Sequence, residues 1–144
     1  MSSFLYDLGR ERFLGVASGS VNWTNDTIKA VLVSSSYTPV QATDDFVANK
    51  IHAFTGTLTA QTLAGKATNG NGTASASNVT FSAVPANFIW SAVVLFKHDG
   101  TANPGGYPLI AYMDSTSITG LPLTSSGGDI TISWNTGANK IFKL

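Results

Sequence analysis

Apolar and polar side chains alternate along several short segments of this chain, with the two-residue period of half-buried β-strands. Residues 77–84 read SNVTFSAV and residues 130–134 read ITISW, so every second side chain is apolar. Residues 28–33 (IKAVLV) are almost continuously apolar and rich in branched side chains, which favours a buried strand. The Asn-Gly pairs of residues 69–72 (NGNG) indicate a tight turn, because both residue types adopt positive φ at low cost.

Residues 88–97 (FIWSAVVLFK) are apolar on both faces, which predicts a central strand covered twice. Simple alternation places Trp90 on the same face as Ala92, Val94 and Phe96, with Val93 and Leu95 on the other face. We expect the strand at 130–134 to pair inside the sheet, with the 88–97 strand as one candidate partner. The predicted core residues, expected to be buried and mutually close, are Phe81, Val94, Phe96, Ile132 and Trp134.

The spacing of these segments predicts about seven short strands with almost no helix. The expected fold is therefore all-β, a single-domain β-sandwich, jelly roll or small barrel with a short N-terminal helix or arm. Residues 4–14 contain the one helix candidate, with Phe4, Leu5 and Leu8 at helical spacing and Ser3 as N-cap. We assign residues 1–20 to this arm or helix and residues 21–144 to the β domain, and we expect residues 1–14 to contact another subunit or the larger surface to which the protein binds.

Composition narrows the classes of function. Eight basic and eight acidic residues cancel, and charged residues make up only 11% of the chain. The few basic residues are scattered along the sequence, so we expect no nucleic-acid binding, and a net charge near zero favours association. The chain has no cysteine, no run long enough for a membrane span and no basic, apolar leader at its start. We therefore expect synthesis and folding in a cytoplasm and no contact with membranes.

Candidate catalytic and metal-binding groups are sparse. His98 and Asp99 are neighbours, but adjacent strand residues point to opposite faces, so a turn is favoured over a catalytic pair. The aspartates beside Gly, Ser or Thr are typical of turns rather than of a metal cage; these are Asp44, Asp45, Asp99, Asp114 and Asp129. No phosphate-binding glycine motif is present. We expect no enzymatic activity, no cofactor and no metal.

Most aromatic residues occupy inward-facing strand positions, which favours core packing over a sugar-binding platform. Trp23 and Tyr107 lie near predicted loops, and we interpret them as candidate interface anchors. Together with the apolar residues of the N-terminal segment they form the predicted interface set: Phe4, Leu5, Leu8, Trp23 and Tyr107.

Several segments resemble a group of small bacteriophage virion proteins. The resemblance rests on FLGVASGSVNWTNDTIKAVLVSSSYTPVQATDDFV, VTFSAV, AVVLFKHDGTANPGGYPLIAYMD and GGDITISWNTGANKIF, and it runs from about Phe4 to Leu144. These motifs are strands and turns rather than active-site residues.

The resemblance implies a capsid decoration or cement protein that binds the outer head surface of the virion and bridges copies of the major capsid protein. It also implies a homotrimer or another homo-oligomer. Two alternatives remain: a neck, tail or fibre component of the phage, and a carbohydrate-binding module displayed on the virion.

Overall fold

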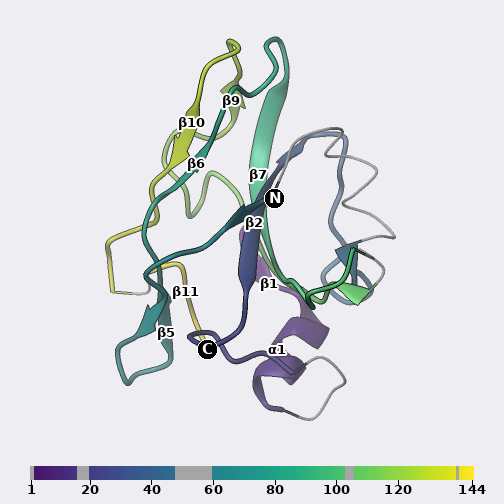
Figure 1. The fold of residues 1–144 in the computed structure, drawn as a ribbon, viewed down its shortest axis with the longest axis vertical. Helices are drawn as coiled ribbons and strands as arrows, with labels where there is room; N and C mark the ends of the chain where they lie inside the picture. The colour runs from purple at the N-terminus through teal and green to yellow at the C-terminus, as the bar shows by residue number, and fades with distance from the viewer. Residues whose placement is uncertain (1, 16–19, 48–59, 103–105, 139) are drawn as a thin grey trace.

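The longest strand, β7 (Ile89–Lys97), lies inside a six-stranded antiparallel sheet in the computed structural model (Figure 1). The order of this main sheet is β1-β8-β7-β2-β3, and β9 pairs with the first residues of β7. The other strands form a β10-β6 pair and a β11-β5-β4 sheet. The structure describes residues 2–15, 20–47, 60–102, 106–138 and 140–144. The remaining elements are β1 (Phe4–Leu5), α1 (Asp7–Phe13), β2 (Ile28–Ser34), β3 (Gln61–Thr62), β4 (Ala67–Thr68), β5 (Thr73–Ser75), β6 (Val79–Phe81), β8 (Leu109–Met113), β9 (Leu123–Thr124), β10 (Ile130–Ile132) and β11 (Phe142–Lys143).

The all-β prediction is confirmed, with α1 as the short helix among the described residues. Alternation located β6 and β10 correctly, and continuous apolar runs located β2 and β7. The NGNG turn joins β4 to β5, and both Gly70 and Gly72 adopt positive φ there. Residues 52–68 alternate weakly, a pattern that predicts two strands. Strands β3 and β4 lie in the described part of this segment, and residues 52–59 are outside the described residues.

The main sheet carries a hydrophobic core on each face. On one face it packs against the β6–β10 and β4–β5–β11 sheets through a first core that includes Leu32, Phe81 and Phe142. On the other face a second core includes Val94 and Tyr37. Strand β7 is therefore covered twice, as its continuous apolar sequence predicted.

The predicted core residues are all buried, but they do not form one cluster. Phe81, Ile132 and Trp134 belong to the first core, whereas Val94 and Phe96 belong to the second. The expectation that all five lie close together is wrong, because consecutive residues of a doubly covered strand face different cores.

A register shift in the β2–β7 ladder corrects the predicted face of Trp90. Val33 pairs with Ala92 but Ser34 pairs with Trp90, so Ser91 is an extra residue in β7. An inserted residue of this kind changes the side on which the following side chains emerge. Trp90 consequently joins Val93 and Leu95 in the first core instead of Val94 in the second.

The N-terminal segment is integrated in the sheet rather than extending from it. Residues 4–5 form β1, which pairs with Tyr112 and Ala111 of β8, and the helix starts only at Asp7. Ser3 is not the N-cap; its hydroxyl donates to the carboxylate of Asp114 at 3.1 Å.

The helix is fixed by a buried arginine. Arg12 is 1% exposed, its guanidinium lies 4.7 Å from the ring centre of Phe46, and it donates to the carbonyl of Asp45 at 3.0 Å. These contacts tie α1 to the segment that follows β2.

The last two strands do not pair with β7, the candidate partner that the sequence suggested for residues 130–134. Strand β10 pairs with β6, not with β7, and β11 pairs with β5. Trp134 lies beyond the end of β10 but is buried, and its Nε1 donates to the carbonyl of Ser77 at 2.9 Å.

Candidate interaction surfaces

One end of the molecule, which we call the apical tip, exposes two large apolar side chains. The tip consists of residues 82–89 and 123–129, whose loops lie together at the top of Figure 1. Phe88 is 51% exposed and Ile89 is 55% exposed. Neighbouring apolar residues of this size on a surface typically mark a place where another molecule binds.

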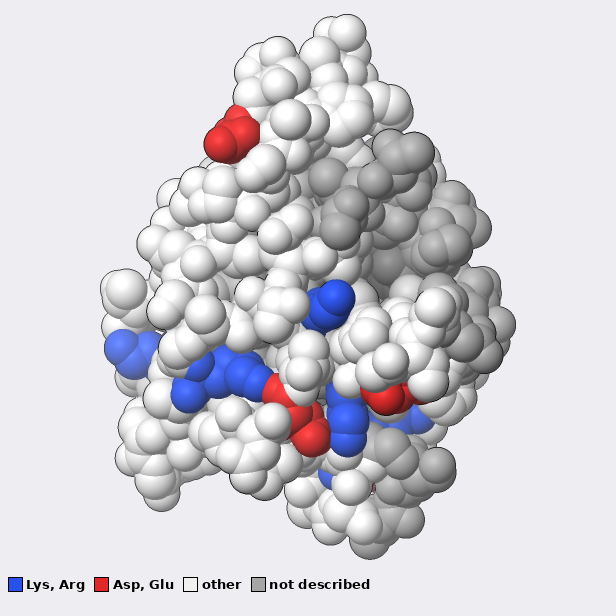
Figure 2. All heavy atoms as spheres, in the orientation of Figure 1, with Lys and Arg blue, Asp and Glu red and all other residues white. Residues whose placement is uncertain are grey.

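The apical tip is almost free of charge. Asp129 is the one charged residue in its sequence, and its carboxylate accepts a hydrogen bond from the backbone N–H of Ala83 at 2.8 Å. Charged side chains gather in the lower half of the face drawn in Figure 2, whereas the upper end is nearly all uncharged. A partner at this end would therefore meet mainly apolar and hydrogen-bonding groups.

Backbone hydrogen bonds hold the two halves of the tip together. The N–H of Val84 donates to the carbonyl of Gly128 at 3.0 Å, and the N–H of Ser125 donates to the carbonyl of Phe88 at 2.8 Å. Two non-glycine residues, Ala83 and Asn87, have left-handed backbones with φ of 50° and 68°. Left-handed conformations in residues other than glycine are held in place by their surroundings. The tip thus has a defined shape.

The predicted interface set is not brought together by the fold. Leu5 and Trp23 are buried in the first core, while Phe4 is half-buried against the second core, where Tyr107 is buried. Leu8 is half-buried on α1. The contacts of these side chains are largely within the chain, so they do not form one continuous exposed surface.

Trp23 and Tyr107 were expected to be exceptions to core packing, and that expectation is wrong. Trp23 is 5% exposed, and its Nε1 donates to the carbonyl of Ser75 at 3.1 Å. Tyr107 stacks on Phe96 with ring centres 5.6 Å apart, and its hydroxyl donates to the carbonyl of Thr101. Each loop folds back on the sheet and buries its aromatic ring.

Asp99 and Asp114 cap turns, as their sequence neighbours predicted: each accepts the backbone N–H two residues on, from Thr101 and Thr116. The other two described cases differ from that prediction. Asp44 is buried and accepts the N–H of Val40, and Asp129 accepts the N–H of Ala83 from a separate loop. The described residues contain no group of three or more His, Cys, Asp or Glu side chains placed to hold a metal.

His98 and Asp99 form no hydrogen-bonded pair with each other in the described structure. The Nδ1 of His98 accepts the N–H of Gly100 at 3.1 Å, and the His98 ring lies 4.6 Å from that of Tyr107. The carboxylate of Asp99 accepts bonds from the N–H and hydroxyl of Thr101, which lower the pKa of Asp99. Both side chains thus accept hydrogen bonds that stabilise the 98–101 turn.

The fold gathers three basic residues that are scattered in the sequence. Arg10, Lys140 and Lys143 line a pocket of about 380 Å³ between β1, β11 and residues 113–117. No acidic residue lines this pocket among the described residues. Basic residues that are far apart in the sequence therefore line one pocket in the folded chain.

Comparisons with models of protein families, with curated proteins and with solved structures found no match for this chain. No helix in the described part of the chain has the length and apolar character needed to cross a membrane. The fold and the surfaces described above therefore carry the functional argument.

Sequence reasoning missed the apical tip. Phe88 and Ile89 continue the apolar run of β7, so they looked like part of the buried strand. The nearby Pro85 and Asn87, two residues typical of turns, are the one signal that Phe88 and Ile89 lie at the end of the strand.

Proposed function

We propose that this protein is a structural component of a bacteriophage particle, a decoration or cement protein that binds the outer head surface and bridges copies of the major capsid protein. It acts as a homotrimer or another homo-oligomer and is incorporated into the virion after synthesis in the host cytoplasm. The resemblance of its strand and turn motifs to small virion proteins, over nearly the whole chain, supports this role.

The apical tip is the observation that carries the proposal. Phe88 and Ile89 are each more than half exposed on an end with a single charged residue. Burying apolar surface stabilises a complex by about 25 cal/mol for each Å² removed from water. A contact of this kind, repeated at every site of a shell, stabilises the shell without needing a tight individual interface.

The test is binding to phage heads that lack this protein. Replacing both exposed side chains (Phe88→Ser with Ile89→Ser) should weaken binding by at least about tenfold, because most of the apolar area at the tip is lost. Val40→Ser is the matched control, since Val40 is 44% exposed after β2, outside both the tip and the N-terminal arm. Occupancy of the heads is measured by sedimentation with the particles and by cryo-electron microscopy.

Two results would contradict the proposal. Equal binding by the double variant and the wild type would remove the tip from the interface. A copy number of six to twelve per particle would favour the neck, tail or fibre alternative over the head shell, which requires hundreds of copies.

A further inference from the structure

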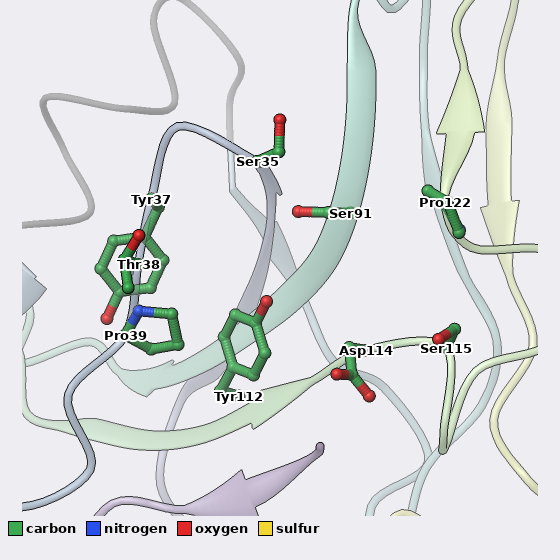
Figure 3. A pocket seen from close by; sticks show the side chains of 9 residues that line it. All are labelled: Ser35, Tyr37, Thr38, Pro39, Ser91, Tyr112, Asp114, Ser115 and Pro122. Carbon is green, nitrogen blue, oxygen red and sulfur yellow. The ribbon is translucent and has the colours of Figure 1, made fainter. Parts of the chain in front are cut away.

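A second surface feature of the molecule is a hydroxyl-lined pocket. It has a volume of about 300 Å³ and lies between the 35–39 loop after β2 and the strands β7 and β8 (Figure 3). Serine, threonine and tyrosine side chains supply most of its lining, Pro39 and Pro122 supply apolar wall, and Asp114 is its charged residue. This volume is at the lower end of the range for small-ligand sites.

The carboxylate of Asp114 is fixed and has one oxygen to spare. Its Oδ1 accepts bonds from the N–H and the hydroxyl of Thr116, at 3.0 and 2.7 Å, and from the hydroxyl of Ser3 at 3.1 Å. Its Oδ2 accepts no hydrogen bond from the described residues. Burial raises the pKa of Asp114, but the bonds from Thr116 and Ser3 outweigh it and leave the pKa below the ordinary value. The pocket thus presents a charged, oriented acceptor at neutral pH.

Hydroxyl groups of β7 and β8 line the same pocket as this carboxylate. Ser91 is the extra residue of the β7 register shift, and its hydroxyl points into the space between β7 and the 35–39 loop (Figure 3). The hydroxyl of Tyr112 is directed to the same side. The Ser91 hydroxyl donates to the carbonyl of Val33 at 3.4 Å and is hydrogen-bonded to Tyr112, and the oxygens of both hydroxyls can still accept from a ligand. The register shift therefore provides the pocket with a polar group that a regular strand would place elsewhere.

The wall formed by the 35–39 loop is held in place by buried hydrogen bonds of Tyr37. The hydroxyl of Tyr37 donates to Oδ2 of Asp44 at 2.8 Å and lies 2.7 Å from the hydroxyl of Tyr6. All three residues are buried. A wall fixed in this way loses little conformational entropy when a ligand binds.

We propose that this pocket binds a neutral saccharide unit, independently of the role in the particle. Sugar hydroxyls would donate to Oδ2 of Asp114 and to the hydroxyl oxygens of Ser91 and Tyr112, and the C–H face of the ring would pack on one of the two prolines. A metal ion fits poorly, because calcium takes six to eight oxygen ligands and one carboxylate lines the pocket. An anionic ligand would be repelled by Asp114.

The experiment is a titration of the ¹⁵N-labelled full chain with the methyl glycosides of glucose, galactose, mannose and N-acetylglucosamine. At least one sugar should bind with millimolar affinity and shift the amide signals of residues 35–39, 91 and 112–115. Asp114→Asn should weaken that binding by about tenfold or more, because the amide retains an acceptor for Thr116 and Ser3 but presents a donor to the pocket. Asp129→Asn, a turn carboxylate outside the pocket, should bind as the wild type does.

Three outcomes would overturn the proposal: no shift with any of the four sugars, shifts outside the pocket, or equal binding by Asp114→Asn and the wild type. If Asp114→Asn does not fold, the map of shifts on the wild type decides the question alone. Loss of sugar binding with undiminished binding to heads would leave the proposed function untouched, and the reverse result would leave the pocket untouched.

Discussion

The ring of Phe96 lies in the second core, 4% exposed and stacked on Tyr107. Phe96→Ala should lower the free energy of unfolding by about 3–5 kcal/mol, because the substitution removes buried apolar surface and leaves a cavity under Tyr107. Urea unfolding followed by tryptophan fluorescence measures this loss.

Phe88→Ala is the control for that substitution, since the Phe88 ring is already half in water. It should cost less than about 1 kcal/mol. A loss at Phe96 as small as the loss at Phe88 would show that the second core contributes little to stability.

Single residues also show where sequence reasoning stops. Phe81 and Trp134 were correctly expected to be buried, because each follows the alternation of its own strand. Trp90 was placed on the wrong face, since an inserted residue depends on the partner strand and leaves no local signal. Trp23 and Tyr107 lie near loops, and the burial of a loop side chain depends on the surface onto which the loop folds. The local sequence does not report that surface, so the burial of these two rings was not predictable.

At the scale of elements, α1 approaches the sheet unusually closely through Gly9. A Cβ atom added at Gly9 would lie 2.9 Å from the carbonyl oxygens of both Leu109 and Ile110 in β8. In a free helix Gly9→Ala would be stabilising by about 1 kcal/mol. Here it should destabilise the protein by about 1–3 kcal/mol, because the helix must move away from β8.

Thermal unfolding of Gly9→Ala beside Glu11→Ala measures the effect, as Glu11 is an exposed position of the same helix. An increase in melting temperature for Gly9→Ala would mean that the contact between α1 and β8 is looser than the structure shows.

The elements themselves were predictable to different degrees. Strands with clean alternation or continuous apolar runs were located from sequence because their pattern reports burial directly. The pattern of residues 4–14 fits a helix as well as a strand followed by a helix, and pairing with β8 decides in favour of the latter. The hydroxyl-lined pocket was not predictable, because its lining comes from segments between Ser35 and Pro122 that only the fold brings together.

At the scale of the whole molecule, carboxylates join distant parts of the chain. Asp26 forms an ion pair with Lys97 at 3.0 Å, and Asp114 binds Ser3. Burial raises the pKa of both carboxyl groups. Their hydrogen bonds, and for Asp26 also the charge of Lys97, lower the pKa by more than burial raises it, so both pKa values lie below the ordinary value. A lowered pKa in the folded state means that the folded state holds the charged form more strongly than the unfolded state does.

Their contribution to stability should therefore be complete above the ordinary aspartate pKa of about 3.9 and lost as the pH falls through the lower folded values. The melting temperature should change little between about pH 7 and pH 5 and fall below about pH 4. Asp26→Asn with Asp114→Asn should flatten this acid limb in calorimetry. An unchanged acid limb in that double variant would assign the effect to other groups.

The pairing of β1 with β8 means that β1 must wait for its partner strand during synthesis. Phe4 and Leu5 are made more than a hundred residues before their partners Tyr112 and Ala111. At 5–20 residues per second this delay amounts to roughly 5–20 seconds. During that interval Phe4, Leu5 and Tyr6 have no β8 strand to pack against. The nascent chain therefore exposes an apolar segment to chaperones and to other nascent chains on the same polysome. In the proposed role as a head decoration protein, which requires hundreds of copies, this exposure would recur in every copy, and assembly in the cell would depend on how well the early segment is shielded.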